Sequence, residues 1–298
     1  MTERDYLAQQ FEENRGHLRG VAYRMLGSLN EADDAVQEAW LRLNRSDAGS
    51  IENLGGWLTT VVARVCLDML RSRGSRREES LDAQVSEPVA SHDKAPNPEQ
   101  EALLADSVGL ALLVVLDRLT PAERLAFVLH DLFAVSFDEI ATIVGRSADA
   151  ARQLASRARR RVQGAGTTAD VDRTQQRPIV DRFLAALRAG DFEGLLKVLD
   201  PDVVVHIDEA AASPGAPRVI HGAQNWARGA VAFAAAFAHV TRFTASALID
   251  GKIGVIAAPD GHLLRALSMK IKDGRITEIE IIGDRAHLEK LDLAVLSD

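Results

Sequence analysis

Residues 136–162, SFDEIATIVGRSADAARQLASRARRRV, contain the pattern that decides how the middle of the chain folds. Ser136 and Glu139 have the spacing of a helix capping box, and Gly145 provides a turn after one short amphipathic helix. Ser147 can cap a second, longer helix that has its own apolar stripe. A short capped helix, a glycine-containing turn and a longer basic helix are typical of a helix-turn-helix.

The second helix of this pattern is rich in arginine, and Asp149 is the one acidic residue close to it. Guanidinium groups bind phosphates bidentately, and residues near the N-terminus of a recognition helix contact base edges. The pattern favours DNA binding over the alternative, a solvated helical hairpin whose arginines only keep it soluble. The side chains that this pattern places for contact with DNA include Arg146, Arg152, Gln153, Arg157 and Arg160.

Two further helical stripes lie upstream and are separated by Gly55-Gly56. The second of them runs into a group of arginines, which we call the arginine cluster. Positive charge is favourable at a helix C-terminus, so a solvated helix end explains the cluster equally well by itself. Beside a helix-turn-helix, a second phosphate-binding surface becomes the favoured interpretation. The arginine cluster consists of Arg64, Arg71, Arg73, Arg76 and Arg77.

The net charge of −8 is concentrated in one part of the 298-residue chain. Residues 78–119 carry 2 basic and 9 acidic side chains, a net charge of −7, so the total says little about any single surface. Cys66 is the only cysteine, which excludes an intramolecular disulfide. No apolar window long enough for a membrane span is present, and the start of the chain is polar. We therefore expect a soluble, cytoplasmic protein that does not contact a membrane.

The last third of the chain changes character and predicts an α+β fold with a curved antiparallel sheet. Asp-Gly pairs between β-type runs are strong hairpin signals. His206 and Asp208 share strand parity and form a candidate pocket pair, although no nucleophile, metal or cofactor signature accompanies them. The expected helices are 178–188, 192–199 and 223–237, the strand is 203–207, and the Asp-Gly pairs lie at 250–251, 260–261 and 273–274.

Several of these segments resemble one family. Residues 33–41, DDAVQEAWL, resemble the core of bacterial sigma-factor domain 2, and residues 56–64, GWLTTVVAR, resemble the helix that follows it. Residues 119–124, LTPAER, and 137–141, FDEIA, resemble sigma domain 4. The whole order is similar to that of extracytoplasmic-function sigma factors that carry a C-terminal SnoaL-like domain.

This resemblance implies a multidomain fold, in which two all-α sigma domains precede an α+β SnoaL-like cone with a curved antiparallel sheet. Domain 2 would be a helical bundle, and domain 4 would contain the helix-turn-helix. We place domain 2 at 8–78, an acidic flexible linker at 79–100, domain 4 at 101–164, a second linker at 165–177 and the SnoaL-like domain at 178–292.

The resemblance also implies a function: a sigma factor that is not an enzyme, needs no cofactor or metal, and directs core RNA polymerase to promoters. Its partners would be promoter DNA and the β′ clamp helices and β flap of the polymerase. Residues 44–53 would capture an unstacked base of the minus-ten element, next to duplex held by the arginine cluster. The helix-turn-helix would read the minus-thirty-five element in the major groove, through a recognition helix with Arg146, Ser147, Ala150, Ala151, Arg152, Gln153 and Arg157. The residues implied at the polymerase, which we call the acidic face, are Asp33, Asp34, Gln37, Glu38 and Leu41.

In such factors the C-terminal domain regulates activity in cis by contacting domain 2 or the linker. This chain departs from the family pattern at 213–218 and 283–288, and its linker retains only Glu87-Pro88 of a longer motif. The acidic linker would thread the basic channels of the polymerase, cover the arginine surfaces of the free protein, or simply be solvated.

Two other functions stay open at this stage. One is a bifunctional protein whose C-terminal domain is an isomerase- or hydrolase-like enzyme acting on a small molecule. The other is a dimeric helix-turn-helix repressor with a palindromic operator, which leaves the domain 2 motif unexplained.

Overall fold

The structure is a computed structural model that describes residues 3–46, 51–82, 109–164, 170–212 and 218–296. The chain forms two compact units. The first comprises residues 1–101 and 118–159, and the second comprises residues 102–117 and 160–298. Within the described ranges, no helix combines the length and the apolar character needed to cross a bilayer.

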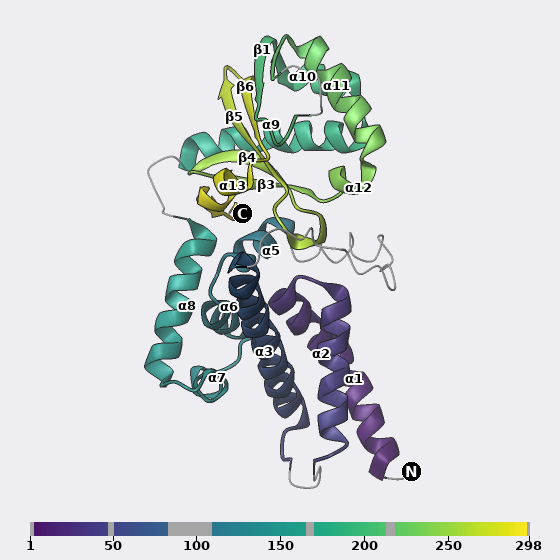
Figure 1. Cartoon of the computed structure of the whole chain (residues 1–298), viewed down its shortest axis with the longest axis vertical. Helices are drawn as coiled ribbons and strands as arrows, with labels where there is room; N and C mark the ends of the chain where they lie inside the picture. Colours follow the sequence, from purple (N-terminus) through teal and green to yellow (C-terminus); the bar gives the residue numbers. More distant parts are fainter. Residues whose placement is uncertain (1–2, 47–50, 83–108, 165–169, 213–217, 297–298) are drawn as a thin grey trace. The chain divides into compact units, whose positions relative to one another are not determined.

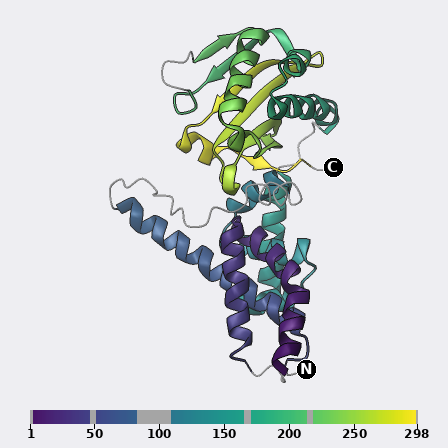
Figure 2. The same cartoon turned by 90° about the vertical axis from the view of Figure 1, so that its right-hand side faces the viewer.

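The first unit begins with three helices, α1 (Glu3–Leu26), α2 (Leu29–Leu43) and α3 (Leu54–Asp82), which pack against one another (Figure 1). Ser28 caps α2, because its hydroxyl accepts a hydrogen bond from the backbone N–H of Glu31. This arrangement confirms the helical bundle expected for domain 2, and α3 continues beyond the bundle as one straight helix (Figure 2). Fully buried apolar side chains of the bundle include Leu18, Met25, Val36, Leu43 and Leu58.

Four helical segments complete this unit: α6 (Pro121–Phe127), the π-helical turn η2 (Val128–Leu132), α7 (Phe137–Val144) and α8 (Ala148–Gln163), whose last residues belong to the second unit. The chain therefore contains the expected helix-turn-helix, α7 followed by α8.

Capping side chains define where these helices begin and end. Thr120 and Ser136 both form complete capping boxes with the glutamate three residues later. Gly145 ends α7 with a φ of 73°, a left-handed conformation that glycine adopts without steric cost. Ser147 accepts a hydrogen bond from the backbone N–H of Ala150 at 3.2 Å and so begins α8. The sequence signals for both helices are confirmed.

The second unit is built on a seven-stranded sheet in the order β2-β1-β6-β5-β4-β3-β7. The strand β1 pairs in parallel with β6, whereas the other neighbouring pairs are antiparallel. The sheet is therefore mixed rather than antiparallel throughout, because the meander from β3 to β6 ends with β6 beside β1 and running in the same direction. The strands are β1 (Leu199–Ile207), β2 (Val219–His221), β3 (Thr244–Ile249), β4 (Lys252–Ala257), β5 (Arg265–Lys272), β6 (Arg275–Ile282) and β7 (Leu293–Ala294).

Two of the three Asp-Gly pairs form the expected tight hairpin turns. Asp250 and Gly251 join β3 to β4 with φ values of 49° and 76°, and Asp273 and Gly274 join β5 to β6 with 52° and 76°. Positive φ at both central residues is the signature of a type I′ turn. The third pair lies in a longer connection that contains the 3-10 turn η3 (Pro259–Gly261).

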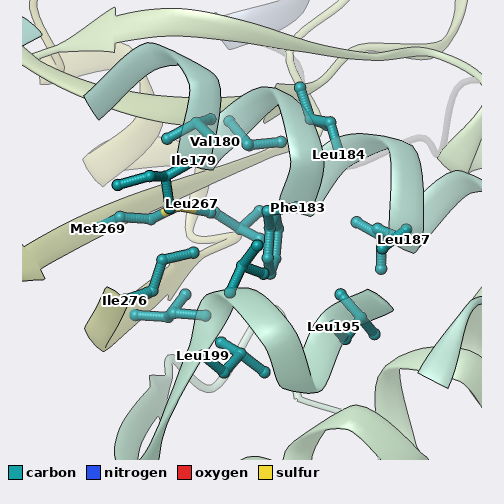
Figure 3. Packing of buried hydrophobic residues seen from close by; sticks show 14 of the residues in the cluster. Ile179, Val180, Phe183, Leu184, Leu187, Leu195, Leu199, Leu267, Met269 and Ile276 are labelled. Carbon is teal, nitrogen blue, oxygen red and sulfur yellow. The ribbon is translucent and has the colours of Figure 1, made fainter. Parts of the chain in front are cut away.

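Helices cover the sheet and close its core. The long helix α9 (Asp170–Ala189) packs on β3 and β4, and its Phe183 points into the core toward Leu267 of β5 (Figure 3). The ring of Phe183 stacks on Trp226 at 5.5 Å. The remaining helices are α10 (Phe192–Val198), α11 (Ala223–Ala236), α12 (Ala238–Thr241) and α13 (Arg285–Lys290).

The helix α5 (Leu110–Asp117) also belongs to this unit, where it packs against β3, β7 and η3. The Nδ1 atom of His262 lies 3.4 Å from Oδ2 of Asp117. At the end of α8, the carbonyl of Val162 accepts a hydrogen bond of 2.8 Å from the backbone N–H of Val295. The compact units thus divide the segment predicted as domain 4, and its first helix lies with the C-terminal sheet.

Candidate nucleic-acid interface and C-terminal cavity

The surface of α8 and the turn before it present most of the side chains predicted to contact DNA. Arg152 lies over the ring of Phe137 at 5.6 Å and forms an ion pair with Asp149. Ala151 corrects the prediction, because it belongs to the buried apolar stripe of α8 and has 0% exposure, which leaves it no surface for DNA. The exposed members are Arg146, Ser147, Arg152, Gln153, Arg157 and Arg160, and Ala150 is half-buried.

The arginine cluster is only partly a surface. Arg64 and Arg71 are exposed on α3, and Arg71 lies 3.9 Å from Asp68. Arg73 instead pairs with Glu31 of α2 and donates a hydrogen bond to the carbonyl of Leu26 at 3.3 Å. Arg73 therefore joins helices within the bundle, which corrects its prediction as a free phosphate contact. The side chains of Arg76 and Arg77 lie outside the described residues.

The acidic face forms one continuous strip of α2. Asp34 and Gln37 are exposed, and Leu41 keeps 41% of its surface exposed. Asp33 accepts two hydrogen bonds from Arg19, at 2.7 and 3.0 Å, and half-buried Glu38 pairs with Arg42 at 2.9 Å. The exposed side of α2 thus combines carboxylates with one exposed apolar side chain, on a helix whose other side is buried.

Two predicted segments fall wholly or partly outside the described residues. In the base-capturing loop, 44–46 and 51–53 are described, and Asn53 accepts a hydrogen bond from the backbone N–H of Gly56 at 3.0 Å. The predicted acidic linker begins inside α3, which ends at Asp82, and its residues from 83 onward are not described.

The helix-turn-helix segment packs against the bundle within the first unit. Here α6 and α7 contact α3, and η2 contacts α1. Arg124 of α6 is only 2% exposed, and its Nε donates a hydrogen bond of 3.1 Å to the carbonyl of Arg24. The ring of Phe133 meets His17 edge-on at 5.1 Å and lies 5.3 Å from the guanidinium of Arg24. The helices that precede α8 are therefore packed on α3, and we call this packing the closed arrangement of the first unit.

The second unit encloses a cavity of about 300 Å³ between α11 and the sheet. Its lining is largely apolar, with Trp226 and Phe233 from α11 and Val255 and Leu267 from the sheet. Arg265 at the start of β5 is the charged side chain among the described residues that line it. Its guanidinium lies 4.8 Å from the centre of the Phe233 ring.

The predicted pocket pair, His206 and Asp208, does not line this cavity. His206 is exposed on β1. The carboxylate of Asp208 accepts hydrogen bonds from the backbone N–H groups of Ala211, Gly283 and Asp284, at 2.7 to 2.8 Å. Burial raises the pKa of Asp208, but these three donors stabilise the charged form and bring the pKa below its ordinary value. Asp208 therefore joins two loops instead of forming a pair with His206.

The described residues offer little for metal binding or nucleophilic chemistry. They contain no cluster of three His, Cys, Asp or Glu side chains able to hold a metal ion. Burial raises the pKa of the Cys66 thiol to about 12, so the thiolate needed for nucleophilic chemistry is scarce at neutral pH.

Sequence reasoning did not find Arg265, Phe233 or the Arg124 contact. The cavity residues come from segments spread between Leu187 and Ile281, and each segment reads as ordinary core. Arg124 was quoted within a family motif, but nothing in its neighbourhood indicates a partner 100 residues away in the sequence.

Two family descriptions match the chain, Sigma-70 region 2 at residues 10–76 and Sigma-70, region 4 at residues 109–162. Probable ECF RNA polymerase sigma factor SigI of Mycobacterium tuberculosis is 35% identical over 291 residues, which are 98% of each chain. ECF RNA polymerase sigma factor SigJ of the same organism is 39% identical over 278 residues, 90% of this chain and 88% of SigJ.

Solved structures are also similar. The crystal structure of SigJ has a TM-score of 0.44 and 32% identity, and the match covers 94% of this chain and 97% of SigJ. An NTF2-like protein of unknown function from Cytophaga hutchinsonii has a TM-score of 0.26 and 15% identity over 38% of this chain and 93% of its own.

Proposed function

Because the chain belongs to the extracytoplasmic-function (ECF) sigma factors of RNA polymerase, which start transcription, we propose that its acidic face binds the core enzyme. The support is the exposed strip of α2, where Asp34, Gln37 and Leu41 lie on the side opposite the buried stripe. The carboxylates supply electrostatic complementarity to a basic partner, and Leu41 supplies apolar area that is covered on binding.

The promoter is bound by two surfaces of unequal kind. On α8, the exposed side chains of Arg152, Gln153 and Arg157 read the minus-thirty-five element, and neighbouring arginines contact phosphates. On α3, the exposed Arg64 and Arg71 hold the backbone beside the minus-ten element. The single observation that carries this assignment is the capped helix-turn-helix, with its arginines outside and its alanine stripe inside.

The closed arrangement has a consequence for activity. The two promoter elements lie about 25 base pairs apart, which is roughly 80 Å of B-DNA. Helices α6 and α7 contact α3 directly, so the two surfaces cannot reach both elements at once in this state. The free protein therefore has to open before it engages a promoter, and the free energy of the Arg124 and Phe133 contacts opposes that opening.

The C-terminal domain regulates this opening in cis through region 4. The supporting observation is that α5, which lies within the region 4 match, packs on β3 and β7, while Val162 at the end of α8 is bonded to Val295. Region 4 is thus tethered at its first and last helices. This differs from the contact with domain 2 or the linker that the resemblance implies.

Charge reversal tests the acidic face. The Asp34→Arg/Glu38→Arg double variant should weaken binding to core polymerase by at least about tenfold, because like charges then face each other across the interface. Affinity is measured with purified core polymerase, and transcription is measured on a promoter library. The matched control is Asp181→Arg/Asp202→Arg, two exposed carboxylates of the second unit, which should leave both readouts unchanged. Wild-type affinity in the first variant would contradict the proposal.

A proline at position 295 tests the tether. Val295→Pro removes the N–H that Val162 accepts, whereas Val295→Ala keeps it. Loss of a hydrogen bond costs about 1 kcal/mol, which shifts the population of the tethered state about fivefold. We expect the full-length Val295→Pro protein to transcribe faster than the Val295→Ala protein in single-round assays. Equal rates from two equally folded proteins would remove the tether from the mechanism.

A further inference from the structure

The cavity of the second unit is too large to be a packing defect. Protein interiors are close-packed, and voids larger than a water molecule are few. A volume of about 300 Å³ lies at the lower end of the range that ligand pockets occupy. It is enclosed by α11 on one side and by strands of the sheet on the other, all belonging to the second unit.

Two polar side chains of the cavity are hydrogen-bond donors for which no partner is found among the described residues. The guanidinium of Arg265 and the indole N–H of Trp226 have no hydrogen bond or ion pair with any described residue. Thr244 differs, because its hydroxyl donates to the carbonyl of Thr241 at 2.8 Å and accepts a hydrogen bond from Arg188 at 3.1 Å. Arg265 and Trp226 therefore present hydrogen-bond donors to the cavity that no described acceptor of its lining satisfies.

Arg265 is a cation in apolar surroundings. Its partial burial lowers its pKa, and the negative charge of Asp208 offsets this only in part. Asp208 forms no ion pair with Arg265, and its carboxylate oxygens accept the backbone N–H groups of Ala211, Gly283 and Asp284. A desolvated charge is costly unless an opposite charge and hydrogen bonds compensate it. Stacking on Phe233 supplies only part of that compensation.

We propose that this cavity binds a small monocarboxylic acid with an apolar body, whose carboxylate pairs with Arg265. A guanidinium donates two parallel hydrogen bonds that match the two oxygens of a carboxylate. The apolar walls formed by Val255 and Leu267 cover the body of the ligand and disfavour a strongly hydrated dianion. An amine or another cation is excluded by charge repulsion with Arg265.

All residues that line this site belong to the second unit and none is a predicted promoter contact, so the proposal does not depend on promoter binding. It assigns ligand binding to the domain and no chemical step.

Calorimetry on the full-length protein tests the site directly. The probes are octanoate and 2-naphthoate, each paired with its neutral amide, octanamide and 2-naphthamide. We expect saturable binding of one molecule of each acid, and at least about tenfold weaker binding of each amide. Equal affinity for acid and amide, or no binding of either acid up to millimolar concentration, would overturn the proposal.

Three variants separate the charge of Arg265 from the shape of the cavity. Arg265→Gln should weaken acid binding by about tenfold or more and leave amide binding unchanged. Arg228→Gln, an exposed arginine of α11, is the matched control and should bind like the wild type. Gly229 also lines the cavity and has open space at its Cβ position, so Gly229→Leu should reduce binding of acids and amides alike. If Arg265→Gln keeps full affinity for the acids while Gly229→Leu loses it, the carboxylate assignment is wrong.

Discussion

Arg124 in the helical unit and Arg265 in the C-terminal unit are both withdrawn from water, yet their surroundings differ. Arg124 is almost fully buried and donates to a backbone carbonyl of another helix, so its charge is solvated by the protein itself. Arg265 faces a cavity lined by apolar side chains, and its guanidinium lies over the aromatic ring of Phe233. The difference teaches that burial of an arginine indicates a structural role where acceptors surround it. Where they do not, it indicates a binding site.

The comparison predicts opposite effects on stability when each charge is removed. Arg124→Met leaves the carbonyl of Arg24 without its donor, and should lower the free energy of unfolding by about 2–3 kcal/mol. Arg265→Met replaces a cation that is only partly compensated with an apolar side chain of similar length. This variant should leave the free energy of unfolding unchanged or raise it by about 1 kcal/mol.

Urea unfolding followed by circular dichroism measures both variants beside the wild type. Arg228→Met provides the exposed reference, for which a change within about 0.5 kcal/mol is expected. A large destabilisation by Arg265→Met would show that the protein itself compensates this charge, and the two regions would then be alike.

A smaller effect on the free energy of unfolding is expected at Asp208, a charged group of the same unit whose hydrogen bonds are satisfied. Its pKa is lowered in the folded state, so its stabilising contribution is present above the ordinary carboxyl pKa of 3.8 and is lost as the pH falls through the folded value. Asp208→Asn should cost roughly 1 kcal/mol at pH 7, because the amide accepts through one oxygen only. Unfolding of the variant and the wild type at pH 7 and at pH 3 measures this difference. A cost that is as large at pH 3 as at pH 7 would exclude the charge as its source.

Local signals predicted the helical part of the fold well. The capping boxes at Thr120 and Ser136, the left-handed Gly145 and the apolar stripe of α2 are each set by residues within one or two turns. The hairpins at Asp250 and Asp273 belong to the same class, because two residues suffice to fix a type I′ turn.

Features that depend on residues far apart in the sequence could not be predicted from local patterns. The parallel pairing of β1 with β6 follows from the path of about 70 intervening residues. Arg73 reads as part of a basic cluster, and only the fold brings Glu31 beside it. Ala151 was predicted to contact DNA, but it belongs to the buried stripe of α8. Arg265 lies in an ordinary strand, and only the fold shows that the described residues lining its cavity include no acidic side chain.

The packing of α5 on the C-terminal sheet has a practical consequence for the design of truncated variants. Nearly every side chain of this helix is apolar and buried, including Leu113 and Leu116, and its packing partners come from β3, β7 and η3. A fragment that ends near Gln163 retains α5 but lacks those strands, so it exposes an apolar helix to solvent. Such a fragment would aggregate or bind non-specifically. A change in its transcription activity would then reflect poor solubility and not the loss of regulation by the C-terminal domain.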